Sequence, residues 1–209
     1  MTQGQSGIKG RRERERQELR RAILATARGI AAREGWRAVT IRKVAEGIEY
    51  SPPMIYQYFT SKDDLLLALL REGFGELTER LRRAQRTESA TPPEEVLARV
   101  AEEYWAFAWE HPELYQVMHG LGGVPFGTEA TPPEARAAFA ALRDAVRPLV
   151  GTMSATDLDE AVDLLWATLH GLTALTMAGR IAGGQRRATM IMGRAVRDLV
   201  RAWRASAGG

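Results

Sequence analysis

The chain has 209 residues, of which 45% are hydrophobic, and a formal net charge of +3 at pH 7. It contains no cysteine, which excludes a disulfide framework and a thiolate metal site. Residues 1–21 are polar and basic and hold no apolar run of a signal peptide. No segment is apolar over about 18 residues, so we expect no membrane span and a cytoplasmic protein.

The charge is distributed unevenly along the chain. Residues 1–62 contain 13 Lys and Arg against 6 Asp and Glu, a net of +7. Residues 63–209 contain 16 against 20, a net of −4. This asymmetry indicates a basic head that binds a polyanion and a body with another task. The alternative is an ordinary fluctuation in sign between solvated helix faces.

Apolar residues recur at helical spacing, and the pattern predicts an all-α protein of about nine helices. Residues 1–10 are expected to be a disordered tail, followed by a helix over 12–34. Thr40 is a predicted N-cap of a second helix, which buries Val44 and Ala45. After a turn at 49–51, a third helix covers Met54 to Phe59, and Ser61 caps a fourth over 62–86.

Two Thr-Pro-Pro-Glu sequences, beginning at Thr91 and Thr131, predict capping boxes that start helices over 92–110 and 132–149. A short helix is expected from His111-Pro112 to Gly120, followed by a mobile glycine-rich loop over 120–127. The last two helices are expected over 156–181, with Thr156 as N-cap, and over 185–205.

The second and third helices, joined by a tight turn, have the pattern of a helix-turn-helix. Residues from Arg21 to about Leu70 resemble the DNA-binding domain of TetR-family transcriptional regulators. The matching sequences are Glu34-Gly35-Trp36, Thr40-Ile41-Arg42-Lys43-Val44-Ala45, Ile55-Tyr56-x-Tyr58-Phe59 and Ser61-Lys62. In the C-terminal part, Trp166-x-x-x-His170-Gly171 resembles the Trp-His-Gly type of TetR C-terminal domain.

The resemblance implies a DNA-binding domain over 11–62 and an effector-binding and dimerisation domain over 63–209. It also implies a homodimer on double-stranded DNA, most often a repressor released from a palindromic operator by a small molecule. No cofactor, metal or enzymatic activity is expected, and the DNA-bound protein would lie at the bacterial nucleoid. The alternative is a helical small-molecule-binding protein or enzyme whose head no longer reads DNA.

The third helix is expected to enter the major groove with its N-terminal residues at the base edges. Gln57 can pair with adenine, whereas Met54 and the prolines offer only apolar contact. Tyr56, Tyr58 and Lys62 match positions that contact phosphate, and Arg14 belongs to a basic arm. Packing of Tyr56 on the first helix, a core position for Met54 and a solvated arginine face remain open alternatives. The expected DNA contacts are Arg14, Thr40, Arg42, Ser51, Pro53, Met54, Tyr56, Gln57, Tyr58 and Lys62.

Two positions depart from the family pattern. Glu49 occupies the turn position that is usually Gly, where a positive φ would cost about 1 kcal/mol, so either the turn is adjusted or the strain is tolerated. Pro53 disfavours helical geometry at Pro52 and removes an N–H from the start of the recognition helix. These departures put the base-reading roles of residues 52–54 in doubt, but not the fold.

The body is rich in aromatic and Met residues, which are expected either to line an apolar effector pocket or to form ordinary core. The candidates are Trp105, Trp109, Tyr115, Met118, Phe126, Trp166 and His170, which favour an apolar or aromatic ligand. For His170, helix packing is the favoured alternative to ligand contact. A stripe on the last helix, Met192, Val196, Leu199 and Trp203, is the expected dimer interface.

Overall fold

The computed structural model describes residues 3–86, 90–120, 124, 126–151 and 155–207. These residues form nine α-helices and two short 3-10 turns, and none of them lies in a β-strand, which confirms the predicted all-α class. They divide into two compact units, residues 1–71 with 112–122 and residues 72–111 with 123–209. We call the first unit the head and the second the body. None of the described helices is long and apolar enough to cross a membrane.

The head contains α1 (Gln3–Glu34), η1 (Trp36–Ala38), α2 (Ile41–Gly47) and α3 (Pro52–Tyr56). It also contains the first part of α4 (Lys62–Gln85) and all of α6 (Pro112–Gly120). Its core is formed by aliphatic and aromatic side chains that are at most 2% exposed. They include Ile23, Ala27, Val44, Ala45, Ile55, Phe59, Leu65 and Leu69.

Helices α1 and α2 approach each other closely at Gly47. A Cβ atom placed on this residue would lie 2.6 Å from Cγ2 of Thr26 on α1. Real Cβ atoms do not reach that distance, so a side chain here would require Thr26 or the backbone to shift. Nothing in the periodicity of the sequence marked Gly47 as a packing position.

Helix α6 belongs to the head, although we placed it in the second domain from the sequence. The indole Nε1 of Trp36 donates a hydrogen bond to the carbonyl oxygen of Glu113 at 2.8 Å. The guanidinium of Arg28 donates to the Glu113 carboxylate at 3.4 Å, and both side chains are largely buried. These contacts, together with packing of α6 on α1, tie a segment distant in sequence to the head.

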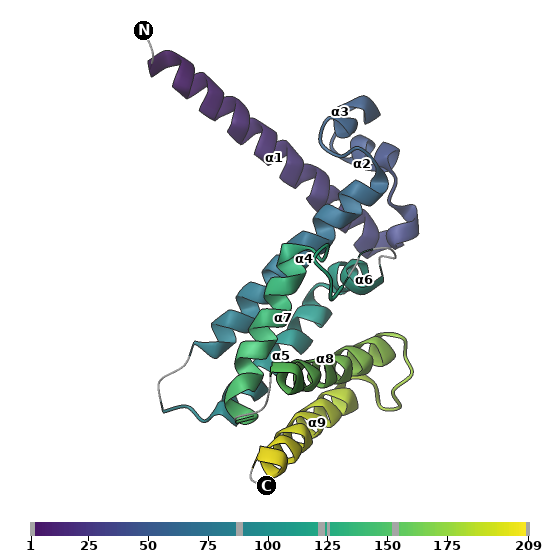
Figure 1. Cartoon of the computed structure of the whole chain (residues 1–209). Helices are drawn as coiled ribbons and strands as arrows, with labels where there is room; N and C mark the ends of the chain where they lie inside the picture. The colour runs from purple at the N-terminus through teal and green to yellow at the C-terminus, as the bar shows by residue number, and fades with distance from the viewer. Residues whose placement is uncertain (1–2, 87–89, 121–123, 125, 152–154, 208–209) are drawn as a thin grey trace. The chain divides into compact units, whose positions relative to one another are not determined.

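The body contains the rest of α4, α5 (Pro93–Glu110), α7 (Pro133–Val146), η2 (Arg147–Leu149), α8 (Ala155–Met177) and α9 (Gly184–Ala207). Helices α8 and α9 lie side by side, as Figure 1 shows, and both pack on α5. Arg80 joins α4 to α5, because its guanidinium pairs with Glu110 and lies 5.7 Å from the ring centroid of Phe107. The hydrogen bond from Arg80 lowers the pKa of Glu110.

Several helix ends differ from the sequence-based expectation. Residues 3–10, expected in a disordered tail, lie in α1. The N-caps of α5 and α7 are Pro92 and Pro132, not the preceding threonines, and neither helix has a side-chain cap. The second proline of each pair disfavours helical geometry at the first, so the helix begins one residue later. Thr156 lies inside α8, and the predicted mobile loop over 120–127 falls partly outside the described residues.

Candidate functional site

The start of α2 has the predicted cap. The side chain of Thr40 accepts a hydrogen bond from the backbone N–H of Lys43 at 3.2 Å, and Thr40 remains exposed. Two residues after Thr40, the side chain of Arg42 is 84% exposed and pairs with Glu46 at 2.9 Å. An exposed pair of this kind contributes little to stability, so Arg42 can exchange Glu46 for a phosphate at small cost.

The turn between α2 and α3 is built around Glu49, whose φ of 59° is in the left-handed region. The N–H of Tyr50 donates to the carbonyl of Ala45 at 2.9 Å, and that of Glu49 donates to Glu46 at 3.2 Å. This is the Schellman pattern of a helix C-terminus, in which glycine usually occupies the left-handed position. The expected strain is therefore present at Glu49, and the backbone geometry of the turn is kept.

Helix α3 spans Pro52–Tyr56 and ends earlier than the expected Phe59. Gln57 and Tyr58 lie in the following turn. Pro52 and Pro53 both lie in its first turn, although the second proline disfavours helical geometry at the first. The N–H of Met54 donates to the carbonyl of Ser51 at 2.9 Å. Helix α3 therefore begins at Pro52 with both prolines in its first turn.

Two sides of α3 have opposite character. Ile55 is fully buried and Phe59 is 2% exposed, so they anchor the α3 segment to the head core. The opposite side presents exposed side chains, with Tyr56 54% exposed, and Met54 half-buried beside them. The exposed set is Ser51, Pro53, Tyr56 and Gln57. Packing of Tyr56 in the interior is thereby excluded within the head.

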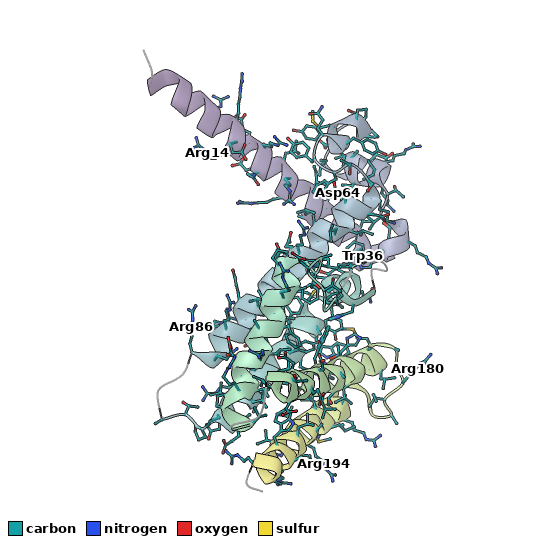
Figure 2. The ribbon with its side chains drawn as sticks, in the orientation of Figure 1. Arg14, Trp36, Asp64, Arg86, Arg180 and Arg194 are labelled. Carbon is teal, nitrogen blue, oxygen red and sulfur yellow. The ribbon has the colours of Figure 1, made fainter. Side chains whose placement is uncertain are left out.

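Arginines of α1 contribute to the same region. The guanidinium carbon of Arg16 lies 5.9 Å from the ring centroid of Tyr58, and that of Arg20 lies 5.3 Å from the ring of Phe59. Residues 11–18 of α1 are all exposed, and Figure 2 shows Arg14 on this N-terminal part of the helix. Arg11 pairs with Glu15 at 2.8 Å. The predicted basic arm is thus a helix with interleaved acidic residues.

Lys62 has a structural partner that the sequence did not reveal. Its ammonium donates a hydrogen bond to the carbonyl oxygen of Trp36 at 3.1 Å. The N-terminus of α4 is already capped within the chain, since Ser61 Oγ accepts from the N–H of Asp64 at 3.1 Å. The Asp64 carboxylate in turn accepts from the N–H of Thr60 at 2.8 Å. Less of this helix end is available to a phosphate than the sequence suggested.

The body contains a cavity of about 490 Å³ between α4, α5, α7 and α8. Of the seven residues expected in the effector pocket, only Phe126 and Trp166 line it. The lining also contains residues outside these seven. They are Phe74, Leu77, Tyr104, Gly127, Thr128, Thr131, Ala135, Arg136, Ala138, Phe139, Leu142, Asp159 and Asp163.

The other expected pocket residues lie elsewhere. Tyr115 and Met118 are on α6, are at most 2% exposed, and belong to the core of the head. Trp105 is 6% exposed, and its ring lies 5.8 Å from that of Trp109. His170 is half-buried, and burial lowers its pKa, but it does not line the cavity. These residues were candidates because of their side-chain type, which does not show which space a side chain faces.

The expected dimer stripe on α9 also needs correction. Met192 and Val196 are each 3% exposed and Trp203 is 7% exposed within a single chain. Helix α9 packs on α5 and α8 of the same chain, and Leu199 is half-buried. Side chains already buried within one chain add little surface for a second copy to cover.

No group of three or more His, Asp or Glu in the described part of the chain is placed to hold a metal ion. The structure instead brings together a helix-turn-helix with an exposed recognition surface and a helical body with an apolar cavity.

Comparisons with known proteins agree with this arrangement. Residues 23–69 match the family model of bacterial regulatory proteins of the tetR family, and residues 97–203 match the tetracyclin repressor-like C-terminal domain. An uncharacterized HTH-type transcriptional regulator of Mycobacterium tuberculosis is 27% identical over 165 residues, which cover 77% of this chain and 71% of the relative. The finer Trp-His-Gly assignment of the C-terminal domain stays a prediction.

Solved structures share the fold. A protein of unknown function from Rhodococcus sp. RHA1 is 25% identical, with a TM-score of 0.73 over 88% of this chain and 94% of the other. A TetR variant from Acinetobacter baumannii AYE, in complex with minocycline, is 19% identical, with a TM-score of 0.65 over 88% and 96%. Because the family model of the C-terminal domain alone covers just over half of the sequence, the chain belongs to the TetR family of bacterial transcriptional regulators.

Proposed function

We propose that this regulator is a homodimeric repressor that binds a palindromic operator and is released by a small apolar or aromatic effector. The observation that carries the proposal is the exposed side of the α3 segment, held in place by the buried Ile55 and Phe59. An exposed Gln beside apolar Pro and Met side chains suits the floor of a major groove, where hydrogen bonds and thymine methyls are both read.

The proposed contacts divide into two kinds. Gln57 reads a base edge through its amide, and Pro53 and Met54 give apolar contact. The contacts to the DNA backbone come from the start of α2, from the N-cap residue and the two tyrosines of the α3 segment, and from the lysine that opens α4. These residues are Thr40, Arg42, Ser51, Tyr56, Tyr58 and Lys62, with Arg14 extending along the flanking phosphates.

The dimer surface that we propose replaces the stripe on α9. Large apolar side chains are exposed on the outer faces of α8 and α9, with Leu164 50%, Leu175 43% and Met190 63% exposed. Gly171, one turn before Leu175, has open space where a Cβ would lie. A small residue beside exposed apolar side chains permits a helix of a second copy to approach closely.

Selection of bound sequences from random DNA tests the proposal most directly. A symmetric dimer should enrich a pseudo-palindrome with half-sites separated by whole helical turns, roughly 34 Å each. Gln57→Ala should then cost about 1–3 kcal/mol and relax the preference at one base position. Tyr56→Phe, which removes a single hydroxyl, should weaken binding to all sequences alike.

The outcome that would overturn the proposal is also clear. If no sequence is enriched, and no DNA is retarded in a gel at about 50 mM salt, where electrostatic binding is strong, the head does not read DNA. The protein would then be a helical small-molecule-binding protein that kept the fold of a regulator.

A further inference from the structure

The cavity of the body has walls of two different kinds. The surfaces from α4, α5 and α7 carry the apolar side chains Phe74, Leu77, Tyr104, Ala135, Ala138, Phe139 and Leu142, with Arg136 as the charged residue of α7. Helix α8 contributes Asp159, Asp163 and Trp166, whose spacing of four and three residues places them on one face of the helix. A ligand in this cavity therefore meets mostly apolar groups, with the carboxylates on α8 and one guanidinium on α7.

The two carboxylates of α8 differ in their state of pairing. Asp159 is bound by Arg143, whose Nε donates to Oδ1 at 2.5 Å, so its charge is compensated within the chain. Asp163 forms no ion pair or hydrogen bond with the rest of the described chain, and it is exposed at the mouth of the cavity. Asp163 thus offers an uncompensated negative charge to whatever enters.

Aromatic rings continue from this carboxylate into the cavity. Trp166 follows Asp163 by one helical turn, and its ring centroid lies 6.1 Å from that of Phe126. The ring of Phe126 in turn lies 5.9 Å from that of Phe74. The faces of aromatic rings carry negative electrostatic potential and attract cations, most strongly for Trp. A carboxylate beside a row of such rings is complementary to a positive charge on an apolar framework.

One cationic side chain, Arg136, is found in the described lining. It is exposed at the start of α7, and its Nη1 donates to the carbonyl oxygen of Glu129 at 3.0 Å. Arg136 belongs to a different wall from Asp163, so the two charges make opposite predictions. A cationic ligand should depend on Asp163, and an anionic ligand should depend on Arg136.

We propose that the effector is a lipophilic aromatic monocation, such as a quaternary or protonated amine. Its charge lies between Asp163 and Trp166, and its apolar part lies among Phe74, Phe126 and Phe139. This inference rests on the proposed function and specifies the chemical class of its effector.

Three naphthylmethyl probes test the charge selectivity. The ammonium (1-naphthylmethyl)trimethylammonium and the uncharged 1-neopentylnaphthalene are isosteres, and the anion 1-naphthaleneacetate shares only their naphthylmethyl group. Isothermal titration of the full-length protein should show binding of the ammonium about fivefold or more tighter than the uncharged isostere, because the two share apolar burial and only the ammonium gains the charge contacts. The anion should bind most weakly.

Substitutions test which residue is responsible for the preference for the ammonium. Asp163→Asn should reduce the affinity for the ammonium about two- to fivefold and leave that for the isostere nearly unchanged. Glu160→Gln removes the same charge from an exposed position of α8 outside the cavity, and should change neither affinity. Arg136→Gln should strengthen ammonium binding or leave it unaltered. A thermal melt of each variant in the absence of probe verifies that the body remains folded.

Equal affinity for the ammonium and its isostere, tightest binding of the anion, or no binding of any probe would overturn the inference. So would an affinity for the ammonium that Asp163→Asn leaves unchanged. Gel-shift measurements on the same preparations separate this result from the proposed function. Retarded DNA without charge-selective binding rejects the cationic effector alone, whereas absence of DNA binding rejects the repressor itself.

Discussion

The ammonium of Lys62 at the start of α4 and the carbonyl oxygen of Trp36 in η1 lie 3.1 Å apart, joined by a hydrogen bond. The indole of Trp36 donates in turn to the carbonyl of Glu113 on α6. A residue expected at the DNA backbone therefore also fixes the position of a turn that holds α6. Lysine has three N–H donors, so one bond to Trp36 leaves two for a phosphate.

Lys62→Met should separate these two roles. Loss of the bond to Trp36 should lower the free energy of unfolding by about 0.5–1.5 kcal/mol, measured by urea denaturation. Loss of one phosphate contact should also reduce the slope of log affinity against log salt by about 0.9. An unchanged salt slope with reduced stability would show that Lys62 serves the fold alone.

Glu49→Gly should stabilise the head. Glycine adopts the left-handed conformation of residue 49 without the roughly 1 kcal/mol cost that a Cβ imposes, so the free energy of unfolding should rise by about that amount. Glu49→Ala removes the same carboxylate but keeps the Cβ, and serves as the matched control. If both variants change stability equally in chemical denaturation, charge rather than backbone strain is responsible.

Substitutions on the two faces of α9 should have different consequences. Met190→Glu places a charge on the exposed face and should convert the dimer to a folded monomer in sedimentation velocity. Trp203→Glu places a charge at a buried position of the body and should instead destabilise it by about 3 kcal/mol or more. A Met190→Glu protein that remains dimeric would refute the proposed surface.

Stability should fall on mild acidification because of His170. Burial lowers its pKa in the folded chain below the ordinary histidine value of 6.5, so the unfolded chain binds the proton more readily. The resulting loss in the free energy of unfolding is absent above pH 6.5, grows as the pH falls below that value, and levels off below the pKa of His170 in the folded chain. His170→Leu should flatten the dependence between about pH 5 and 7, measured by denaturation at each pH. An identical pH profile in the variant would contradict the assignment.

Local patterns predicted the helices and two of their caps correctly. Thr40 and Ser61 cap their helices because an N-cap bond joins residues only three apart and needs no distant partner. The sequence identified Glu49 as the turn position that usually holds Gly, and the structure decided between an adjusted turn and a strained residue, because φ at Glu49 is 59°. The predicted starts of α5 and α7 were one residue too early. In each pair, the second proline disfavours helical geometry at the first, which therefore becomes the N-cap.

The sequence by itself determined an all-helical chain with a helix-turn-helix head, because helical periodicity, caps and turns depend on neighbours within a few residues. Only the tertiary structure decided what each apolar face meets. Trp203 and Val196 form a regular stripe that is buried within their own chain, where α9 packs on α5 and α8, and Tyr115 serves the head rather than the pocket. Burial is non-directional, and periodicity shows that a side chain points inward without showing which distant segment it contacts.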